Sequence, residues 1–437
     1  MTGAAAGIRL RYISLSALRW FPGGLVIPVI VLLPTARGMS LPKIGLLAAI
    51  YTSAVVLLDV PAGALADMYG RRQVLCAASL INVFGCALFA IADTFWIFGV
   101  AQALMALGRA LNNGPLDAWY VDATKAADPD ADVSKGFGRA ESVLQLSLGM
   151  GALTALALIH FVSGLPSHGN APVLVLSTPV LAAIPVMLLN AIATWWLVTD
   201  THHTRHDAER GISLTALPDV VRSGFAIARG HVWIRLVLLS AATTGFATQG
   251  MEQLGPRLLD QVLHHDERTA AAVFSIVFLG SYLACAVSAA ATSRAQRAFR
   301  GPRTALGVGL VAAGLFSSLI GATSFVVSIS IAYSLTFFFL GIRNPMEKIT
   351  LSGYVDEQRR ATVMSVRTLA QTVGTLAGSL TLPLIAATEG YRDGFLTVAG
   401  AFTATGFLIA GKSARRLSPE QETRVTNPAS EKSKERI

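Results

Sequence analysis

Long apolar runs separated by short polar turns recur along nearly the whole chain. Two of the clearest, 44–65 and 74–92, are each long enough to cross a ~30 Å hydrocarbon layer as a helix. Twelve such runs can be distinguished, at about 12–34, 43–65, 73–92, 95–120, 137–163, 172–198, 231–256, 268–292, 303–322, 324–348, 362–387 and 391–411. The pattern therefore predicts an all-α membrane protein with twelve transmembrane helices.

Composition supports a membrane protein and argues against a soluble one. Of the 437 residues, 53% are hydrophobic and 14% are charged, and the mean hydropathy is +0.56. Soluble globular chains carry roughly 25% charged residues. The three cysteines, Cys76, Cys86 and Cys285, all fall inside predicted spans and show no metal-ligand spacing. They are expected to be packing residues, and neither a metal nor any other cofactor is expected.

The basic residues predict an orientation in the membrane. With twelve spans, most Lys and Arg residues fall on the side that carries both termini. The opposite side receives only Arg37, Lys43, Arg257, Arg268 and Arg392. The positive-inside rule then places both termini in the cytoplasm, which for a bacterial chain means the inner membrane. The net charge of +9 has the same origin, and without a groove-reading motif it does not indicate nucleic-acid binding.

Polar stretches divide the chain into two halves and a tail. Residues 1–198 are expected to form an N-terminal six-helix bundle, and residues 231–411 a C-terminal one. Residues 199–230, the longest polar stretch between spans, are expected to be a cytoplasmic linker that contains an amphipathic helix on the membrane surface. The charged tail, 412–437, is expected to be disordered.

The two halves repeat one another. Arg109 of the fourth span is followed by Tyr-Val-Asp at 120–122, and Arg343 of the tenth span is followed by Tyr-Val-Asp at 354–356. The offset of 234 residues is the same for both features. Parallel repeats of this kind are typical of transporters whose halves are related by an axis along the membrane normal. The sequence therefore predicts two pseudo-symmetric six-helix bundles.

A short charged turn between the second and third spans carries the most specific motif. It contains Gly63, Asp67, Gly70, Arg71 and Arg72. This spacing resembles the loop signature of the major facilitator superfamily. The resemblance implies a gating role, in which Asp67 pairs with the opposite half when the cytoplasmic side is shut and the two arginines anchor that contact. The alternative is that Arg71 and Arg72 only fix the membrane topology.

Charged residues inside the first two spans are candidates for the transport path. Arg19 and Asp59 lie at similar depth in antiparallel neighbouring spans, so they are expected to meet as an ion pair. The pair either supports the fold permanently or breaks when a proton or a substrate binds, and the sequence leaves both alternatives open.

Polar segments broken by proline occur at matching positions in the fourth and tenth spans, which is a pointer to the binding site of a transporter. The alternative is that these residues pair only with each other and support the fold. The residues concerned are Arg109, Asn112, Asn113 and Asp117 in the first half and Arg343 and Glu347 in the second.

The seventh span contributes three more candidates, Gln249, Glu252 and Gln253. Glu252 is the preferred proton carrier of the second half, because a carboxyl group held away from water can exchange protons near neutral pH. The alternative is that the helix ends at Gly250 and that Glu252 is simply exposed.

No catalytic constellation and no Walker-type Gly-Lys-Ser/Thr motif is present, so neither an enzyme nor direct use of ATP is expected. The sequence predicts a monomeric secondary transporter in the lipid bilayer, exporting a small-molecule substrate in exchange for protons that move through Asp59, Asp117 or Glu252. Many drug/proton antiporters of the superfamily carry an Arg in the fourth span. They also usually carry a Gly-Pro in the fifth, where residues 142–151 have no proline. The alternatives are an importer or facilitator of an anionic metabolite, and, in a different class, a transporter-like receptor or a non-transporting membrane partner.

Overall fold

Every regular element in the described part of the chain is a helix. The computed structural model describes residues 3–129, 131, 133–199, 231–299, 301–352, 354 and 357–414. Almost all of the linker predicted at 199–230 lies outside these residues, as does the predicted tail beyond Ala414. The amphipathic helix and the disordered tail therefore stay predictions.

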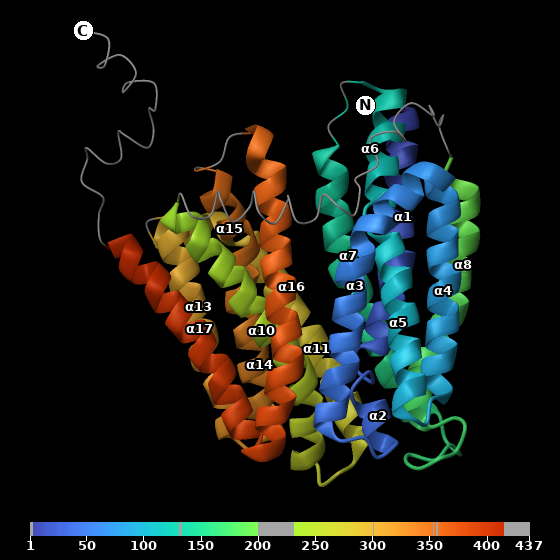
Figure 1. Ribbon diagram of the computed structural model, residues 1–437, viewed down its shortest axis with the longest axis vertical. Helices are drawn as coiled ribbons and strands as arrows, with labels where there is room; N and C mark the ends of the chain where they lie inside the picture. The colour runs from blue at the N-terminus through green and yellow to red at the C-terminus, as the bar shows by residue number, and fades with distance from the viewer. Residues whose placement is uncertain are drawn as a thin grey trace.

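The helices form two bundles that stand side by side (Figure 1). The first contains α1 (Gly3–Val26), α2 (Leu32–Ala36), α3 (Leu41–Tyr69), α4 (Arg71–Ile91), α5 (Phe95–Asn112), α6 (Pro115–Ala127), α7 (Ser134–Phe161), the short 3-10 helix η1 (Val175–Ser177) and α8 (Thr178–Leu197). The second contains α10 (Val232–Val262), α11 (Glu267–Ala290), α12 (Thr292–Ala298), α13 (Pro302–Ala322), α14 (Val326–Gly341), α15 (Arg343–Ser352), α16 (Glu357–Thr388) and α17 (Tyr391–Ala414). α1 begins and α17 ends toward the upper face in Figure 1.

The helices agree with the twelve predicted spans. Ten segments of the described chain are long and apolar enough to cross a membrane. Two further helices, α1 and α10, are 24 and 31 residues long and lie inside the bundles. Neither contains a stretch as apolar as those ten, because each carries several charged side chains. These two helices also line the cavity described below.

Three predicted spans are broken or extended relative to the sequence pattern. The fourth is divided between α5 and α6 at Gly114, which has a φ of +90° and precedes Pro115. A residue before proline avoids the helical region, so the break has a local cause. The tenth is divided between α14 and α15 at Ile342, which keeps helical backbone angles (φ −75°, ψ −18°), so this break is milder than the one at Gly114. The seventh does not end at Gly250, because α10 continues to Val262, and the alternative that placed Glu252 beyond the helix is wrong.

A single residue, Gly70, joins α3 to α4. It is buried and has a φ of +97°, a conformation that side chains other than glycine rarely adopt. The predicted turn between the second and third spans is therefore as tight as its glycine content indicates.

Glycines allow the same pair of helices to touch in each bundle. A Cβ atom on Gly24 of α1 would lie 2.1 Å from the backbone oxygen of Leu148 in α7. A Cβ atom on Gly374 of α16 would lie 1.8 Å from the backbone oxygen of Ala242 in α10. Small residues let helix backbones approach closely in membranes, where lipid is as apolar as the helices themselves. The repeat predicted from sequence is therefore visible as equivalent α1–α7 and α10–α16 contacts.

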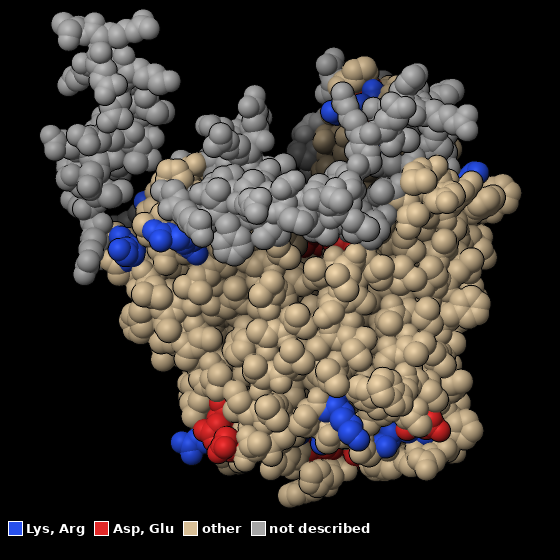
Figure 2. All heavy atoms as spheres, viewed as in Figure 1, with Lys and Arg blue, Asp and Glu red and all other residues tan. Residues whose placement is uncertain are grey.

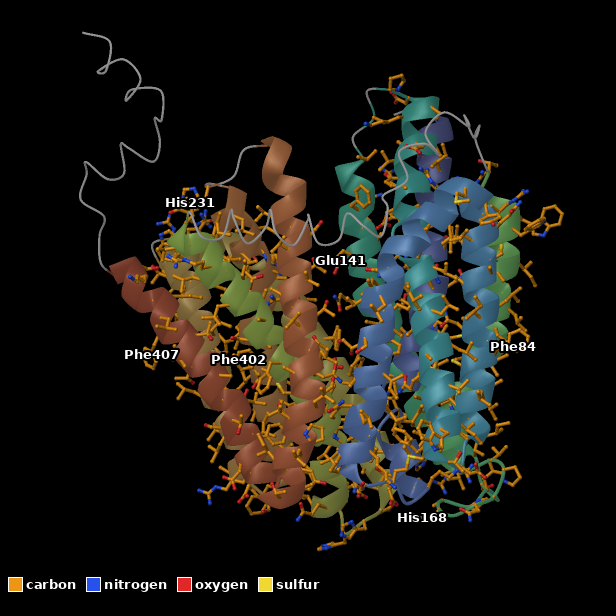
Figure 3. The ribbon with its side chains drawn as sticks, in the orientation of Figure 1. Phe84, Glu141, His168, His231, Phe402 and Phe407 are labelled. Atoms are coloured by element: carbon orange, nitrogen blue, oxygen red, sulfur yellow. The ribbon has the colours of Figure 1, made fainter. Side chains whose placement is uncertain are left out.

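The surface fits a lipid environment. Figure 2 shows charged side chains gathered near the upper and lower rims of one face, with a broad and largely uncharged belt between them. Large apolar side chains point outward from the flanks of both bundles, for example Phe84 (67% exposed) and Phe407 (63% exposed) (Figure 3). Exposed apolar area of this extent marks a membrane-facing surface.

The two bundles are joined at the lower face. Arg268 of α11 donates hydrogen bonds of 2.9–3.0 Å to the last carbonyl oxygens of α7 and its cap, those of Ile159, His160 and Val162. His168, in the loop before η1, contacts the buried carboxylate of Glu267 (Figure 3). We refer to these contacts of Arg268 and His168 as the lower gate. A cation at a helix C-terminus is favourable because the unpaired carbonyls there carry partial negative charge.

Candidate functional site

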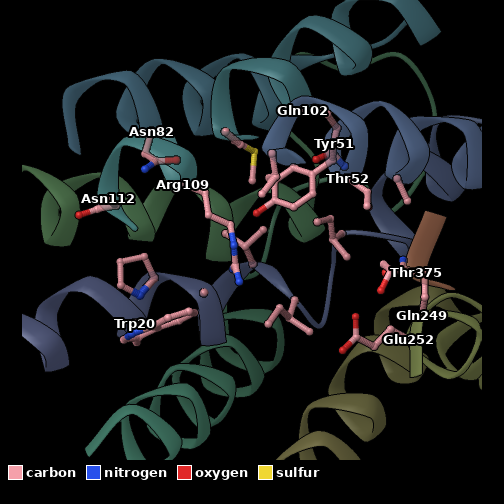
Figure 4. A pocket seen from close by; sticks show the side chains of 18 of the residues that line it. Trp20, Tyr51, Thr52, Asn82, Gln102, Arg109, Asn112, Gln249, Glu252 and Thr375 are labelled. Carbon is pink, nitrogen blue, oxygen red and sulfur yellow. The ribbon is translucent and has the colours of Figure 1, made fainter. Parts of the chain in front are cut away.

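A cavity of about 600 Å³ lies between the two bundles (Figure 4). Its size is in the range of small-molecule sites. Helices α1, α3, α4, α5, α7 and α8 of the first bundle line it together with α10, α11 and α16 of the second. Of the predicted residues, it brings together Arg19, Asp59, Arg109, Asn112, Asn113, Gln249, Glu252 and Gln253.

Arg19 and Asp59 are linked through an amide rather than directly. Arg19 donates to the side-chain oxygen of Asn113 (3.1 Å), and the Asn113 amide nitrogen donates to Asp59 (3.0 Å). The predicted direct ion pair is therefore replaced by a bridge. The break between α5 and α6 causes this, because it frees Asn113 from the helix and places its side chain between the two charges. Asp59 stays exposed to solvent.

Arg109 lies deep in the first bundle and is accessible from the cavity. Its guanidinium group lies 5.3 Å from the ring centroid of Trp20, and that of Arg19 lies at the same distance from that ring. The phenol of Tyr51 is also within hydrogen-bonding reach of Arg109. Aromatic faces attract cations, so Trp20 and Tyr51 hold Arg109 in place.

Glu252 faces Arg109 from the other bundle. It projects into the cavity from α10, beside Gln249, on the side opposite α5 (Figure 4). Among charged side chains, Arg109 has the main electrostatic interaction with Glu252. In the described part of the chain the two groups do not form a direct ion pair, so their charges act on one another across the cavity.

Two cavity amides are buried without hydrogen-bond partners. Among the described residues, the side-chain oxygen of Gln102, on α5, and both polar side-chain atoms of Gln253, on α10, have no hydrogen-bond partner. The two residues are 4% and 2% exposed. Gln253 was among the predicted residues, whereas Gln102 was missed. Its signal in the sequence is its position seven residues before Arg109, which places both side chains on one helix face.

Arg343 and Glu347 do not line the cavity. Glu347 is fully buried and accepts hydrogen bonds from Ser240 (2.7 Å), Arg343 (3.1 Å) and Arg367 (2.6 Å). The polar residues predicted in the tenth span therefore form a closed network inside the second bundle. This matches the alternative in which they pair with each other and support the fold. Arg367 was missed because it lies on a different span, α16.

Asp117 also lies away from the cavity lining. It is exposed at the start of α6 and accepts a hydrogen bond of 2.7 Å from Tyr12. The alternative in which Asp117 pairs with Arg109 is not seen among the described residues, since Asp117 accepts from Tyr12 and Arg109 lies against Trp20 and Tyr51.

The turn motif makes contacts within the first bundle. Arg71 forms an ion pair of 2.5 Å with Asp122 of α6, and Arg72 stacks on the ring of Trp195 at 4.3 Å. Gly63 lies within α3, and the side chain of Asp67 lies outside the described part of the structure. The gating role of Asp67 therefore stays a prediction. Within the described residues, no group of His, Cys, Asp and Glu side chains is arranged to hold a metal ion.

Comparison with known proteins gives one family. The model of the Major Facilitator Superfamily matches residues 13–379. An uncharacterized MFS-type transporter of Bacillus subtilis (strain 168), YxaM, is 28% identical over 108 residues, a match that spans 25% of this chain and 27% of that protein.

Solved structures show the same fold at low identity. The nucleoside transporter NupG is 12% identical and superposes with a TM-score of 0.75, covering 94% of this chain and 100% of that chain. A bacterial homologue of the human lysosomal transporter Spinster, in an inward-facing and unoccupied conformation, is 14% identical. It has a TM-score of 0.74 and covers 96% of this chain and 100% of that chain. Identities this low show the fold alone.

Proposed function

Because the chain belongs to the major facilitator superfamily and is a multi-pass membrane transporter, we propose that it exports small organic molecules by proton-coupled alternating access. The observation that carries this proposal is Glu252 of the second bundle facing Arg109 of the first across the cavity. The cavity lies within a single chain, which supports action as a monomer.

Protonation of Glu252 provides a physical route to coupling. When ionised, Glu252 attracts Arg109, and the attraction is strong where little water separates them. When protonated, Glu252 no longer attracts Arg109. Since the two residues belong to different bundles, proton binding changes the relative stability of conformations that hold the bundles close together or apart. A ligand or proton shifts such an equilibrium only by interacting differently with the two conformations.

Asp59 is the second candidate proton carrier. It is exposed and is joined to Arg19 only through Asn113. A proton on Asp59 would weaken that bridge, while Arg19 keeps its hydrogen bond to Asn113 and its contact with the ring of Trp20. Asp117, the third predicted carrier, is no longer proposed, because it lies outside the cavity.

The lower gate supports the alternating-access part of the proposal. Arg268 and His168 join the bundles on the face opposite the ends of α1 and α17. With both termini in the cytoplasm, as we propose from the basic loops, the structure corresponds to a conformation closed on the outer side. Export then requires these contacts to break once the substrate has bound and Glu252 has released its proton to the cytoplasmic side. On the outer side the substrate leaves and Glu252 takes up a proton.

The runner-up is import of an anionic metabolite. Arg19 and Arg109 lie together around Trp20, and two guanidinium groups suit a carboxylate or a phosphate. Arg343 no longer contributes to this alternative, because it is bonded to Glu347 inside the second bundle. An anion would therefore be bound by the first bundle only.

The test is substrate-induced proton movement in vesicles that contain the purified full chain. A panel of lipophilic cations, organic anions and uncharged solutes is applied with and without a pH gradient. We expect one class to move protons, and Glu252→Gln to abolish that movement because the group can no longer release a proton. Glu389→Gln is the matched control, since Glu389 is exposed at the start of the loop after α16.

Two outcomes would contradict the proposal. Substrate movement that persists unchanged in Glu252→Gln would exclude Glu252 as the proton carrier. If the solute is an organic anion and protons move in the same direction as the solute, the result would support the import alternative instead.

A further inference from the structure

We propose that the transported solute is uncharged and carries an amide, imide or ureido edge, and that Gln102 and Gln253 bind this edge. The inference rests on the proposed transport function and specifies its substrate class. Four observations support it. They are the unpartnered amide atoms in the described part of the cavity lining, the equal numbers of acidic and basic side chains there, the cations that already cover the ring of Trp20, and the position of the two glutamines on different bundles.

The first step is the state of the two amides. The side-chain oxygen of Gln102 and both polar atoms of Gln253 lack partners, although each residue is more than nine-tenths buried. Leaving a buried donor or acceptor unpaired is costly, so nearly all such groups in proteins have a partner. A primary amide offers one acceptor and two donors side by side. Its best complement is another edge with an adjacent donor and acceptor, as in the pairing of glutamine with a nucleobase.

The second step is the charge balance of the cavity. Among the described residues of its lining, two cations, Arg19 and Arg109, are matched in number by two acids, Asp59 and Glu252. Arg19 is bridged to Asp59, and Arg109 faces Glu252. A permanently charged solute would have to displace one of these internal partners. An uncharged solute leaves both in place.

The third step concerns aromatic surface. Lipophilic cations are held by aromatic faces, which attract positive charge. In this cavity the ring of Trp20 already lies 5.3 Å from each of two guanidinium groups. Tyr51 is engaged with Arg109. Tyr282 of α11 also lines the cavity, and its ring packs against two phenylalanine rings. The faces of Trp20 and Tyr51 are therefore engaged by the protein's own cations, which disfavours a lipophilic cation beside these two residues.

The fourth step links recognition to transport. Gln102 belongs to α5 of the first bundle and Gln253 to α10 of the second, and both line the same cavity. Gln253 is adjacent in sequence to Glu252. A solute bonded to both glutamines joins the bundles, so its affinity depends on their relative position. This gives the solute the differential affinity between conformations that transport requires.

The experiment measures equilibrium binding to the purified full chain in detergent. The uncharged probes are uridine, N-acetylglucosamine and a cyclic dipeptide, and the charged probes are tetraphenylphosphonium and salicylate. For a probe that binds, its derivative methylated on the amide or imide nitrogen tests the edge directly without changing the protein. We expect methylation to weaken binding about tenfold through loss of the paired hydrogen bonds.

Glutamine variants identify the protein side of the contact. Gln253→Met and Gln102→Met keep side-chain length and remove the amide, and each is expected to weaken binding about tenfold. Gln145→Met is the matched control, because the oxygen of Gln145 also lacks a partner but this residue does not line the cavity. It is expected to bind as the native chain does.

Three results would overturn the inference. The first is that tetraphenylphosphonium or salicylate binds more tightly than every uncharged probe. The second is that no uncharged probe binds at millimolar concentration. The third is that the methylated derivatives bind as tightly as the parent probes. Failure of the proposed function is distinguishable. If an uncharged probe binds in a glutamine-dependent manner but moves no protons in vesicles, the recognition stands and the coupling fails. If a charged probe moves protons through Glu252, the coupling stands and this inference fails.

Discussion

Two glutamates in the second bundle show how environment assigns different roles to the same residue type. Glu347 is fully buried and accepts hydrogen bonds from three side chains, two of them arginines. Glu252 projects into the cavity and, in the described part of the chain, receives no hydrogen bond. A carboxylate bonded to three donors holds neighbouring helices together, whereas one that faces a cavity is accessible to a proton or a solute. At the residue scale the proton-coupling role that we propose therefore rests on Glu252 and not on Glu347.

The network around Glu347 gives a stability prediction. Glu347→Gln removes the negative charge and leaves Arg343 and Arg367 buried beside each other. Breaking a buried ion pair by removing one partner costs about 3–5 kcal/mol, because the remaining charge is uncompensated. We expect the thermal unfolding midpoint of the detergent-solubilised protein to fall by several degrees or more. Equal midpoints for this variant and the exposed control Glu389→Gln would contradict the structural role.

At the scale of elements, α1 and α10 are equivalent helices with two different faces. One face of each carries glycines that pack against α7 or α16, and the other carries polar residues that line the cavity. The close contact fixes each helix within its own bundle. The polar face then stays directed toward the other bundle, so helix packing positions Arg19 and Glu252.

Substitution of these glycines tests the packing. A Cβ atom on Gly245 would lie 1.9 Å from the backbone oxygen of Gln371, so Gly245→Ala forces α10 away from α16. Overpacking of this kind costs about 1–3 kcal/mol. The matched control is Gly400→Ala in α17, where an added Cβ meets nothing within 4 Å. We expect the unfolding midpoint to fall for Gly245→Ala and to stay the same or rise for the control, where alanine favours the helix. A fall of equal size in both variants would show that the effect is not packing.

At the scale of the whole molecule, the cavity lies between two bundles that the lower gate holds together. Arg268 joins α11 to the last carbonyls of α7, and the loop that carries His168 is itself held by Arg37, which donates to the backbone oxygen of Gly169 (2.7 Å). The gate therefore combines backbone acceptors at the end of α7 with the side-chain contact between His168 and Glu267. In the proposed alternating-access cycle these contacts break when the bundles rotate and re-form when they return.

Removal of Arg268 is expected to open the cavity toward the lower face. The measurement uses Thr372→Cys, a cavity position, in a chain without the three native cysteines, and a membrane-impermeant thiol reagent. In the native gate we expect labelling only from the face that carries the ends of α1 and α17. Arg268→Gln adds labelling from the opposite face, because three hydrogen bonds between the bundles are lost. Arg392→Gln, at an exposed position near the same face, serves as the control. Identical labelling patterns in both variants would exclude Arg268 as a gate residue.

The parts of the site that followed from sequence are those with strong local signals. Arg109, Glu252 and Gln253 stand out as polar residues in apolar runs, and the structure places all three in the cavity lining. Gln102 was missed because a lone glutamine in a span gives a weak signal on its own. Arg343 was proposed by symmetry with Arg109, but the repeat does not specify which side chain finds an internal partner.

The sequence by itself determined the membrane environment, the helices and the repeat, because hydrophobic length and glycine or proline positions act locally along the chain. It did not determine that Asn113 would separate Arg19 from Asp59, or that Arg367 would enclose Glu347. Only the tertiary structure decided these partners, since each contact joins helices that are distant in sequence. Helix packing decides whether a charged side chain is enclosed by partners or faces a cavity. In this protein, packing makes Glu347 a structural carboxylate and leaves Glu252 as a candidate proton carrier.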